Sequence, residues 1–270
     1  MMRGTICLCL LAATAAGCGG GYIMTATDHV APAGADAPFV VRLQRREVGP
    51  VRMSVRRGAL DFRLGEDVIR HGFTDEIGYA GVVLPAPETP GVYSVSVIHR
   101  DIEGDVGRDE AMLYVWPRDA GVVAVDYDSL PRARSQVAGA TEALGKLSEK
   151  ARILYMTREG PAEHGAIHER LARDGFPSGP VLLWQRKRWH IVHIGELRWP
   201  KVVIEDRLVS QLDELRRVFP GLRTAVCAGS LAARAFAEAG LTCYAPEPLD
   251  SPSDDVRYVK SWTHLDAIDP

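Results

Sequence analysis

The chain has 270 residues, 46% of them hydrophobic and 25% charged, which is long enough for two folded domains with apolar cores. Its formal net charge of −3 shows none of the basic excess typical of nucleic-acid-binding proteins, so we expect no nucleic-acid partner. Of the five cysteines, only Cys227 and Cys243 fall in the part expected to fold, which excludes a disulfide scaffold. These two are either buried thiols or a single bridge.

The first 17 residues have the layout of a secretory signal peptide. One positive charge, Arg3, precedes an apolar run over residues 6–16, and small residues stand just before Cys18. This run has about half of the ~20 residues that a membrane-spanning helix needs, which favours a cleaved signal over a transmembrane anchor. The residues before Cys18 resemble the lipobox of bacterial lipoproteins, and that resemblance implies acyl chains on Cys18.

Several acyl chains hold a protein stably on a bilayer, whereas one chain binds only marginally. We therefore expect an exported protein, anchored to a membrane through lipid on Cys18. The expected location is the outer membrane or the cell surface rather than the inner membrane. The alternative is ordinary secretion, with Cys18 as an unmodified thiol.

Two domains are expected after the signal peptide. Residues 18–37 are rich in Gly, Ala and Pro and have no helical or alternating pattern, which indicates a flexible tether. Over residues 38–118, short apolar runs alternate with turn formers; in the run 93–97, tyrosine and valine fall on one side and two serines on the other. Six or seven such runs predict an immunoglobulin-like β-sandwich.

From residue 119 to residue 270, buried strand-like runs alternate with amphipathic helical runs. Such alternation is typical of a parallel sheet covered by helices on both faces, so we expect a Rossmann-like α/β domain. In open sheets of this kind, ligands bind off the carboxyl ends of the strands. The candidate site should therefore lie there.

Polar residues follow the first two expected strands of this domain. Asp126 and Asp128 end the first strand, Thr157 ends the second, and Lys201 follows later in the chain. Two carboxylates, a hydroxyl and a cation are the groups needed to accept and return a phosphoryl group. Asp126 is then the nucleophile, and Asp128 is the general acid and base. The alternative is an aspartate pair that only caps a turn.

This order of motifs resembles the haloacid dehalogenase (HAD) superfamily. The stretch 176–183, FPSGPVLL, is similar to the F-P-x-G-P-L-L-L stretch of lipin-type phosphatidate phosphatases and of the related domain of phosphatidylinositol transfer proteins. Lipin-type proteins also carry an immunoglobulin-like domain, so the resemblance extends over residues 39–247. It implies Asp126 and Asp128 as catalytic residues and Mg²⁺ ligands, with Thr157 and Lys201 binding phosphate.

The chain departs from the family at its fourth motif. Where the family has an acid just after the fourth strand, this chain has no carboxylate over residues 229–234. Magnesium demands near-complete octahedral coordination by oxygen, so this departure puts the metal site in doubt. In a second register Glu205 or Asp206 supplies the missing carboxylate, although that register leaves the last helix and strand unexplained.

A basic and aromatic segment lies between residues 185 and 200. Its membrane-binding candidates are Arg186, Lys187, Arg188, Trp189 and Trp199. Tryptophan prefers the headgroup level of a bilayer, and each Lys or Arg near an anionic surface adds about 1 kcal/mol. The segment is either the seat of a phospholipid headgroup or a solvated β-hairpin.

Two histidines, His164 and His168, have helical spacing. That spacing suits a pair of zinc ligands, but such histidines are more often exposed helix residues.

The sequence supports two functions from different classes. In the first, a membrane-tethered HAD-like domain recognises a phosphorylated, phosphatidate-like headgroup and, if active, hydrolyses it with Mg²⁺ as a phosphatase through an aspartyl-phosphate. In the second, the protein is a catalytically inactive lipid-binding, sensing or scaffold lipoprotein with a degenerate HAD site. The missing fourth-motif acid favours the second, and the intact Asp126, Asp128, Thr157 and Lys201 favour the first. The expected ligand is a phospholipid or another phosphomonoester; protein partners are unknown.

Overall fold

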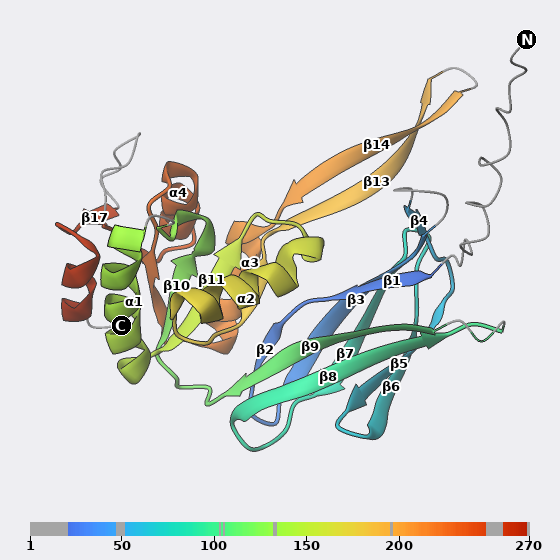
Figure 1. Ribbon diagram of the computed structural model, residues 1–270, viewed down its shortest axis with the longest axis horizontal. Helices are drawn as coiled ribbons and strands as arrows, with labels where there is room; N and C mark the ends of the chain where they lie inside the picture. The colour runs from blue at the N-terminus through green and yellow to red at the C-terminus, as the bar shows by residue number, and fades with distance from the viewer. Residues whose placement is uncertain are drawn as a thin grey trace, which may run out of the picture.

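The computed structural model describes residues 21–46, 52–102, 104, 106–131, 134–194, 197–246 and 256–268. A β-sandwich is followed along the chain by an α/β region, and a long two-stranded hairpin projects from the second (Figure 1). Within these ranges, no helix combines the length and the apolar character needed to cross a bilayer.

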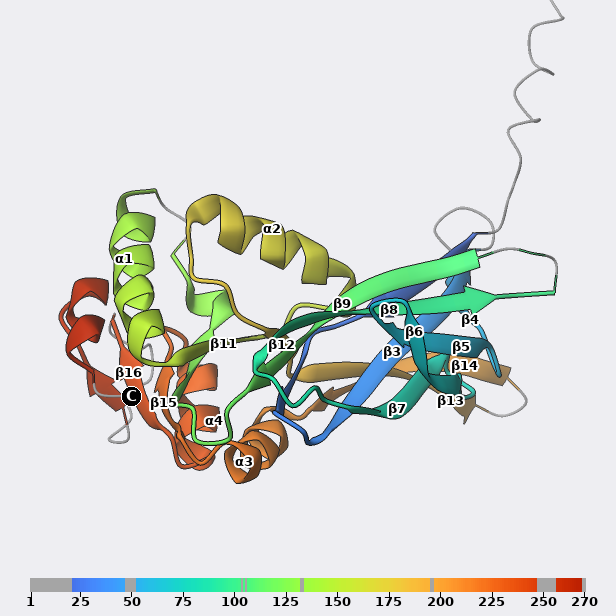
Figure 2. The ribbon, with the colours of Figure 1, turned by 90° about the horizontal axis from the view of Figure 1, so that it is seen from below.

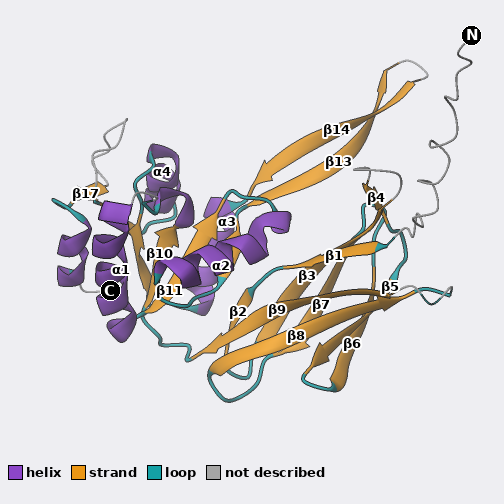
Figure 3. Cartoon of the chain, viewed as in Figure 1, coloured by secondary structure: helices purple, strands orange, loops and turns teal. Residues whose placement is uncertain are grey.

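The N-terminal region is a sandwich of two β-sheets (Figure 3). The first sheet contains β1 (Tyr22–Ala26), β3 (Asp36–Arg46), β4 (Arg52–Ser54) and β7 (Tyr79–Pro85). The second has the order β2-β9-β8-β5-β6 and contains β2 (His29–Pro32), β5 (Ala59–Leu64), β6 (Asp67–Phe73), β8 (Gly91–Arg100) and β9 (Val106–Trp116). Alternate side chains such as Phe39, Phe62 and Val95 are buried between the sheets, which confirms the predicted immunoglobulin-like sandwich.

The sandwich begins at Tyr22, so the expected tether over residues 18–37 is wrong for most of its length. β1 pairs antiparallel with β3, and β2 pairs parallel with β9. Each of these strands has only four or five residues, too few to show a clear alternation, and each depends on pairing with a longer strand, β3 or β9. Cys18 and the expected signal peptide lie outside the described residues.

The C-terminal region confirms the predicted α/β class. Its six-stranded, all-parallel sheet has the order β12-β11-β10-β15-β16-β17. The strands are β10 (Val122–Asp126), β11 (Arg152–Thr157), β12 (Val181–Leu183), β15 (Leu222–Val226), β16 (Thr242–Ala245) and β17 (Val256–Tyr258). The chain lays down β11 and β12 on one side of β10 and then returns to β15 on the other side, which makes the β10–β15 boundary the topological switch point.

Helices cover both faces of this sheet (Figure 2). One face carries α1 (Arg134–Lys150), α2 (His164–Asp174) and the 3₁₀ helix η3 (Trp262–Ala267), and the other carries α3 (Leu208–Val218) and α4 (Ser230–Glu238). Two further 3₁₀ helices are η1 (Tyr127–Ser129) and η2 (Pro161–Glu163). Each face of the sheet therefore packs against its own apolar cluster.

The projecting hairpin consists of β13 (Gln185–Ile194) and β14 (Leu197–Asp206), which pair only with each other. Its base is fixed to the parallel sheet by two backbone hydrogen bonds, from Trp184 N–H to the Thr157 carbonyl (3.1 Å) and from Arg207 N–H to the Trp184 carbonyl (2.9 Å). The hairpin therefore starts beside the end of β11.

The sandwich and the α/β region share a packed joint. Trp116, the last residue of β9, packs edge-on against Phe219 at the end of α3, with ring centroids 5.6 Å apart. Tyr114 and Trp116 belong to the same apolar cluster as α3 and α4. This joint places the end of the sandwich against one face of the parallel sheet.

Candidate functional site

Asp126 stands at the carboxyl end of β10, at the switch point of the sheet. All five residues of β10 are buried, and Asp126 is only 4% exposed. The chain turns directly into η1, which brings Ser129 back so that its hydroxyl donates a hydrogen bond to Asp126 Oδ2. A buried carboxyl group thus closes a run of apolar residues where a ligand site is expected.

Asp128 faces the end of the neighbouring strand β11. Its Oδ1 accepts a hydrogen bond from the Thr157 hydroxyl at 2.7 Å, and its Oδ2 accepts from the Arg158 backbone N–H at 3.0 Å and from Arg158 Nε at 3.2 Å. The Arg158 guanidinium also lies over the Trp184 ring, 5.8 Å from its centroid. The negative charge of Asp128 is therefore largely compensated within the site.

The carboxyl group of Asp126 titrates in a different range from an ordinary aspartate. Burial raises its pKa to about 6 and outweighs the Ser129 hydrogen bond, which lowers it; the charge of Asp128 raises it further, and Arg158 opposes that. The midpoint of its titration therefore lies near pH 6, closer to neutrality than that of an ordinary aspartate. Perturbed carboxyl groups of this kind are common at functional sites.

The N-terminus of α4 approaches the same group from β15. Gly229 is the N-cap and provides no side-chain cap, and the first helical hydrogen bond runs from Ala233 N–H to the Gly229 carbonyl. A Cβ atom at Gly229 would lie 3.6 Å from both Asp126 Oδ2 and Ser129 Oγ, so the helix start is in van der Waals range of the carboxyl group. The positive end of the helix dipole and its first N–H groups thus face the switch point.

The described side chains do not complete a magnesium site here. Asp126 Oδ2 and both oxygens of Asp128 already accept hydrogen bonds, and the residues that follow β15 offer no carboxylate. Glu205 and Asp206 close β14 at the base of the hairpin, with backbones paired to Arg186 and Gln185, and their side chains lie outside the described part. Magnesium ligation by Asp126 and Asp128 stays a prediction that this donor set does not support.

The backbone of Lys201 lies away from the two aspartates. It pairs with His190, five residues from the base of the hairpin, which places it about 17 Å along the hairpin at about 3.3 Å per residue. The five candidates for membrane contact lie on the same hairpin as Lys201: Arg186, Lys187, Arg188 and Trp189 on β13, and Trp199 on β14. The side chains of all six lie outside the described part of the structure, so their roles stay predictions.

Sequence reasoning missed two members of the group at the strand ends. Ser129 and Arg158 hold the two aspartates, and each follows a predicted site residue directly or within three positions. Their chemistry was readable from the sequence, but their orientation depends on the turn of η1 and on the bend after β11.

Sequence reasoning also missed Asp28, which falls in the segment assigned to the tether. It lies between β1 and β2 and contacts His164 and His168 of α2. Burial by itself would raise the pKa of Asp28, but the hydrogen bonds and charges of the two histidines together hold that pKa well below its usual range.

Cys227 and Cys243 are both free and buried. A hydrogen bond between the two thiols, together with burial, raises the pKa of Cys227. They therefore pack as small apolar residues in the core cluster beneath α4.

No known protein family matches the sequence, and no curated protein matches it. Among solved structures, the Ig1-2 module of the Drosophila receptor protein tyrosine phosphatase DLAR is similar at 13% identity over 39% of this chain and 60% of that chain, with a TM-score of 0.27. The titin M3 domain is similar at 13% identity over 36% and 92%, with a TM-score of 0.22. CopC from Methylosinus trichosporium OB3b is similar at 15% identity over 34% and 86%, with a TM-score of 0.23.

The chain spans less than two thirds of the length of the DLAR structures that it matches. These likenesses concern the fold alone. The resemblance to the HAD superfamily and to lipin-type phosphatases therefore stays a prediction.

Proposed function

We propose that the edge of the parallel sheet between β10 and β15 binds the phosphate of a phosphorylated headgroup, on a protein that lipid on Cys18 holds at a membrane. One observation carries the proposal: Asp126, its partner Ser129 and the start of α4 at Gly229 meet at the topological switch point. Phosphate and carboxylate anions bind readily at such a helix start, because its N–H groups and dipole favour negative charge.

The charges around this edge permit an anion there despite the two aspartates. Asp128 is paired with Arg158, so its charge is compensated. Asp126 has a pKa of about 6, so protonation removes its charge at little cost and turns the carboxyl group into a hydrogen-bond donor. A phosphate oxygen bound at α4 would then accept from Asp126 as well as from the helix.

The same geometry favours recognition without hydrolysis. A nucleophilic Asp126 must be ionised, whereas an anion bound beside it favours the protonated form. Asp128 receives three hydrogen bonds from Thr157 and Arg158, which hold it away from the role of general acid and base. The described side chains supply no third carboxylate for a metal that would offset these charges. We therefore favour the lipid-binding or sensing function over the phosphatase.

The test uses the purified Cys18→Ser protein, which carries no acyl chain and so has no anchor of its own, with vesicles of phosphatidylcholine, with and without phosphatidate, and with a soluble phosphomonoester as competitor. We expect phosphatidate-dependent binding that the soluble ester competes away, with no release of inorganic phosphate in the presence of Mg²⁺. Asp126→Asn should tighten binding several-fold at pH 8 by removing a negative charge, and the exposed Asp67→Asn should leave it unchanged.

Two results would overturn this proposal. Phosphate release that Asp126→Asn abolishes would make the protein a phosphatase with Asp126 as nucleophile. Vesicle binding that is insensitive to phosphatidate, to the soluble ester and to Asp126→Asn would place the function elsewhere on the molecule.

A further inference from the structure

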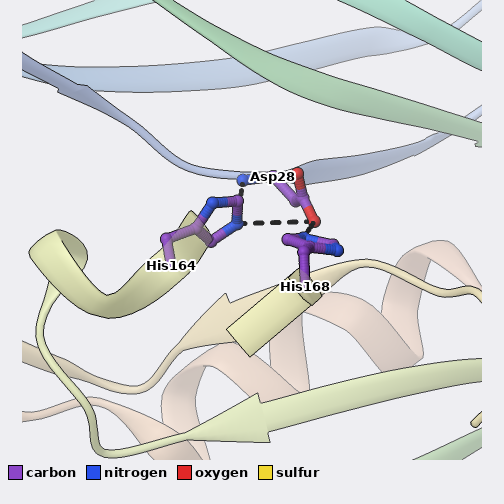
Figure 4. A group of neighbouring side chains, drawn as sticks. All are labelled: Asp28, His164 and His168. Atoms are coloured by element: carbon purple, nitrogen blue, oxygen red, sulfur yellow. Dashed lines mark hydrogen bonds and ion pairs between the residues drawn. The ribbon is translucent and has the colours of Figure 1, made fainter. Parts of the chain in front are cut away.

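A second group of buried polar side chains lies at the joint between the two regions. Asp28 stands in the turn between β1 and β2, while His164 and His168 stand one turn apart on α2, and all three side chains converge (Figure 4). Asp28 Oδ2 lies 2.7 Å from His168 Nε2 and 3.4 Å from His164 Nε2. One ligand atom from each residue fits within 4.8 Å of the others.

We propose that Asp28, His164 and His168 bind a zinc-class transition-metal ion that joins the β-sandwich to the α/β region. Two imidazole nitrogens and one carboxylate oxygen are zinc ligands, whereas magnesium and calcium prefer oxygen alone. This site is separate from the switch-point edge and does not depend on the function proposed there.

The spacing of the ligand atoms fits such an ion. With bonds of about 2.0–2.1 Å, two ligands of a tetrahedral zinc ion lie about 3.3 Å apart. The distance from Asp28 Oδ2 to His164 Nε2 is close to this value at 3.4 Å, and His168 Nε2, now at 2.7 Å, must move away by about 0.6 Å. The His168 side chain is 33% exposed, so it has room to move.

The hydrogen bond at His164 also suits a metal. The Asp28 backbone N–H donates to His164 Nε2 at 3.2 Å, so in this hydrogen bond Nε2 presents a lone pair toward Asp28. That is the form of histidine that ligates a metal, and the ion would replace this long hydrogen bond.

The neighbours of Asp28 hold its carboxylate in place. Val181 N–H of β12 donates to Oδ2 at 2.9 Å, and Met112 N–H of β9 donates to Oδ1 at 3.2 Å. Hydrogen bonds of this kind from outer neighbours orient metal ligands and are a regular part of metal sites. Because one donor comes from the sandwich and the other from the α/β region, the carboxylate is fixed from both sides.

An ion pair between Asp28 and one histidine explains the presence of a second histidine less well than a metal site does. With Val181 and Met112 already donating, Asp28 needs one further partner, and His168 alone provides it. The two imidazole rings lie edge to face with centroids 4.8 Å apart, a costly arrangement if both are protonated. One dication shared by both rings and Asp28 removes that repulsion.

The site reaches solvent at His168, whose side chain is 33% exposed. Asp28 also lines a cavity of about 210 Å³ between the two regions, although neither His164 nor His168 contributes to its wall. Three protein ligands leave the fourth position of a tetrahedral ion to water or to an exogenous ligand, as in catalytic zinc sites. The ion can therefore enter and exchange without unfolding of the joint.

The test begins with the purified protein after removal of metal by a chelator. We expect one Zn²⁺ per chain by titration calorimetry and a rise in melting temperature with Zn²⁺ concentration, because an ion that binds only the folded state stabilises it. Co²⁺ in place of zinc should give the visible absorption of a tetrahedral nitrogen and oxygen site, and Zn²⁺ should displace it.

Variants assign the site to its ligands. His168→Gln should weaken Zn²⁺ binding roughly 100-fold or more, since loss of an outer-shell partner alone costs about 10- to 100-fold. The matched control is His71→Gln, which removes an exposed histidine that pairs with Asp61 at 2.8 Å without a third ligand; it should leave binding unchanged.

The proposal is overturned if the unmodified protein binds Zn²⁺ no better than His168→Gln does, or if cobalt gives an octahedral spectrum like that of free Co²⁺. The cobalt spectrum needs no variant, so the test remains decisive even if a substitution prevents folding.

Discussion

Buried polar side chains have different roles in the two regions of the molecule. In the sandwich, the buried Thr74 accepts a hydrogen bond from Gly58 N–H and donates one to the Val55 carbonyl, each at 2.7 Å, so it ties two backbone segments together. In the α/β region, the buried Thr157 donates a hydrogen bond to Asp128, and Asp126 accepts one from Ser129. Thr74 and Thr157 are thus both buried, but Thr74 supports the backbone, whereas Thr157 belongs to a side-chain cluster at the expected ligand site.

The joint between the regions should give the largest effect on stability. Asp28→Asn removes the charge that pairs with His168 and turns an NH₂ group toward a backbone N–H that now donates to Asp28. We expect the free energy of unfolding to fall by about 3 kcal/mol, the usual cost of breaking a buried ion pair. Urea unfolding in the presence of a chelator measures it, with the exposed Asp67→Asn as control. A loss below about 1 kcal/mol would show that the joint is weaker than its contacts imply.

Substitution at the switch-point edge should have the opposite effect on the free energy of unfolding, because burial of the charged Asp126 carboxylate destabilises the folded state. The pKa of Asp126 is raised from 3.8 to about 6 in the folded state. The native state thus holds the proton more tightly, so this group's contribution to stability is complete below pH 4 and is lost as the pH rises through 6.

Asp126→Asn should therefore stabilise the protein by roughly 2 to 3 kcal/mol at pH 8 and have little effect at pH 4. Unfolding curves at the two pH values measure the difference. Destabilisation at pH 8 would mean that the carboxylate is favourably solvated or paired in the folded state.

The buried threonines Thr74 and Thr157 allow the sandwich and the α/β region to be compared with the same substitution. Thr74→Val and Thr157→Val should each cost about 1 to 3 kcal/mol, since both leave buried partners without a hydrogen bond. Only Thr157→Val should also weaken binding of a soluble phosphomonoester, by releasing the charge of Asp128 toward the bound anion. Equal binding by both variants would remove Thr157 from the site.

Two exposed ion pairs should give the smallest effect on stability. Arg56 pairs with Glu76 in the sandwich, and Arg158 pairs with Asp128 at the ligand edge. Arg56→Gln and Arg158→Gln should each change the free energy of unfolding by less than about 1 kcal/mol, as is usual for exposed pairs. Arg158→Gln should nevertheless weaken phosphomonoester binding several-fold in a calorimetric titration, whereas Arg56→Gln should not.

The sequence predicted the fold class well because both patterns are local. The alternation at residues 93–97 and the buried run that ends at Asp126 follow the periods of a strand, and the structure places both as expected. The first two strands were missed because four or five residues are too few to show a period, and because pairing with β3 and β9 decides their conformation.

The candidate site was predictable only in part. Asp126, Asp128 and Thr157 were found because the carboxyl ends of neighbouring parallel strands must meet. The contact of Asp28 with His164 and His168 joins residues more than 130 positions apart, and no local pattern carries that information. Lys201 was expected at the site from its order along the chain, yet its backbone belongs to the projecting hairpin.

The most direct test of anion binding at the start of α4 is to locate the bound anion. In a titration of the isotope-labelled protein with a soluble phosphomonoester, followed by backbone amide NMR shifts, we expect the largest changes at Ser230, Leu231 and Arg158, and none at Thr74. The changes should be larger at pH 5.5 than at pH 8, and Asp126→Asn should remove that part of the pH dependence which belongs to the carboxyl group. Saturable binding that leaves the amides of the α4 start and of Arg158 unshifted would contradict the account.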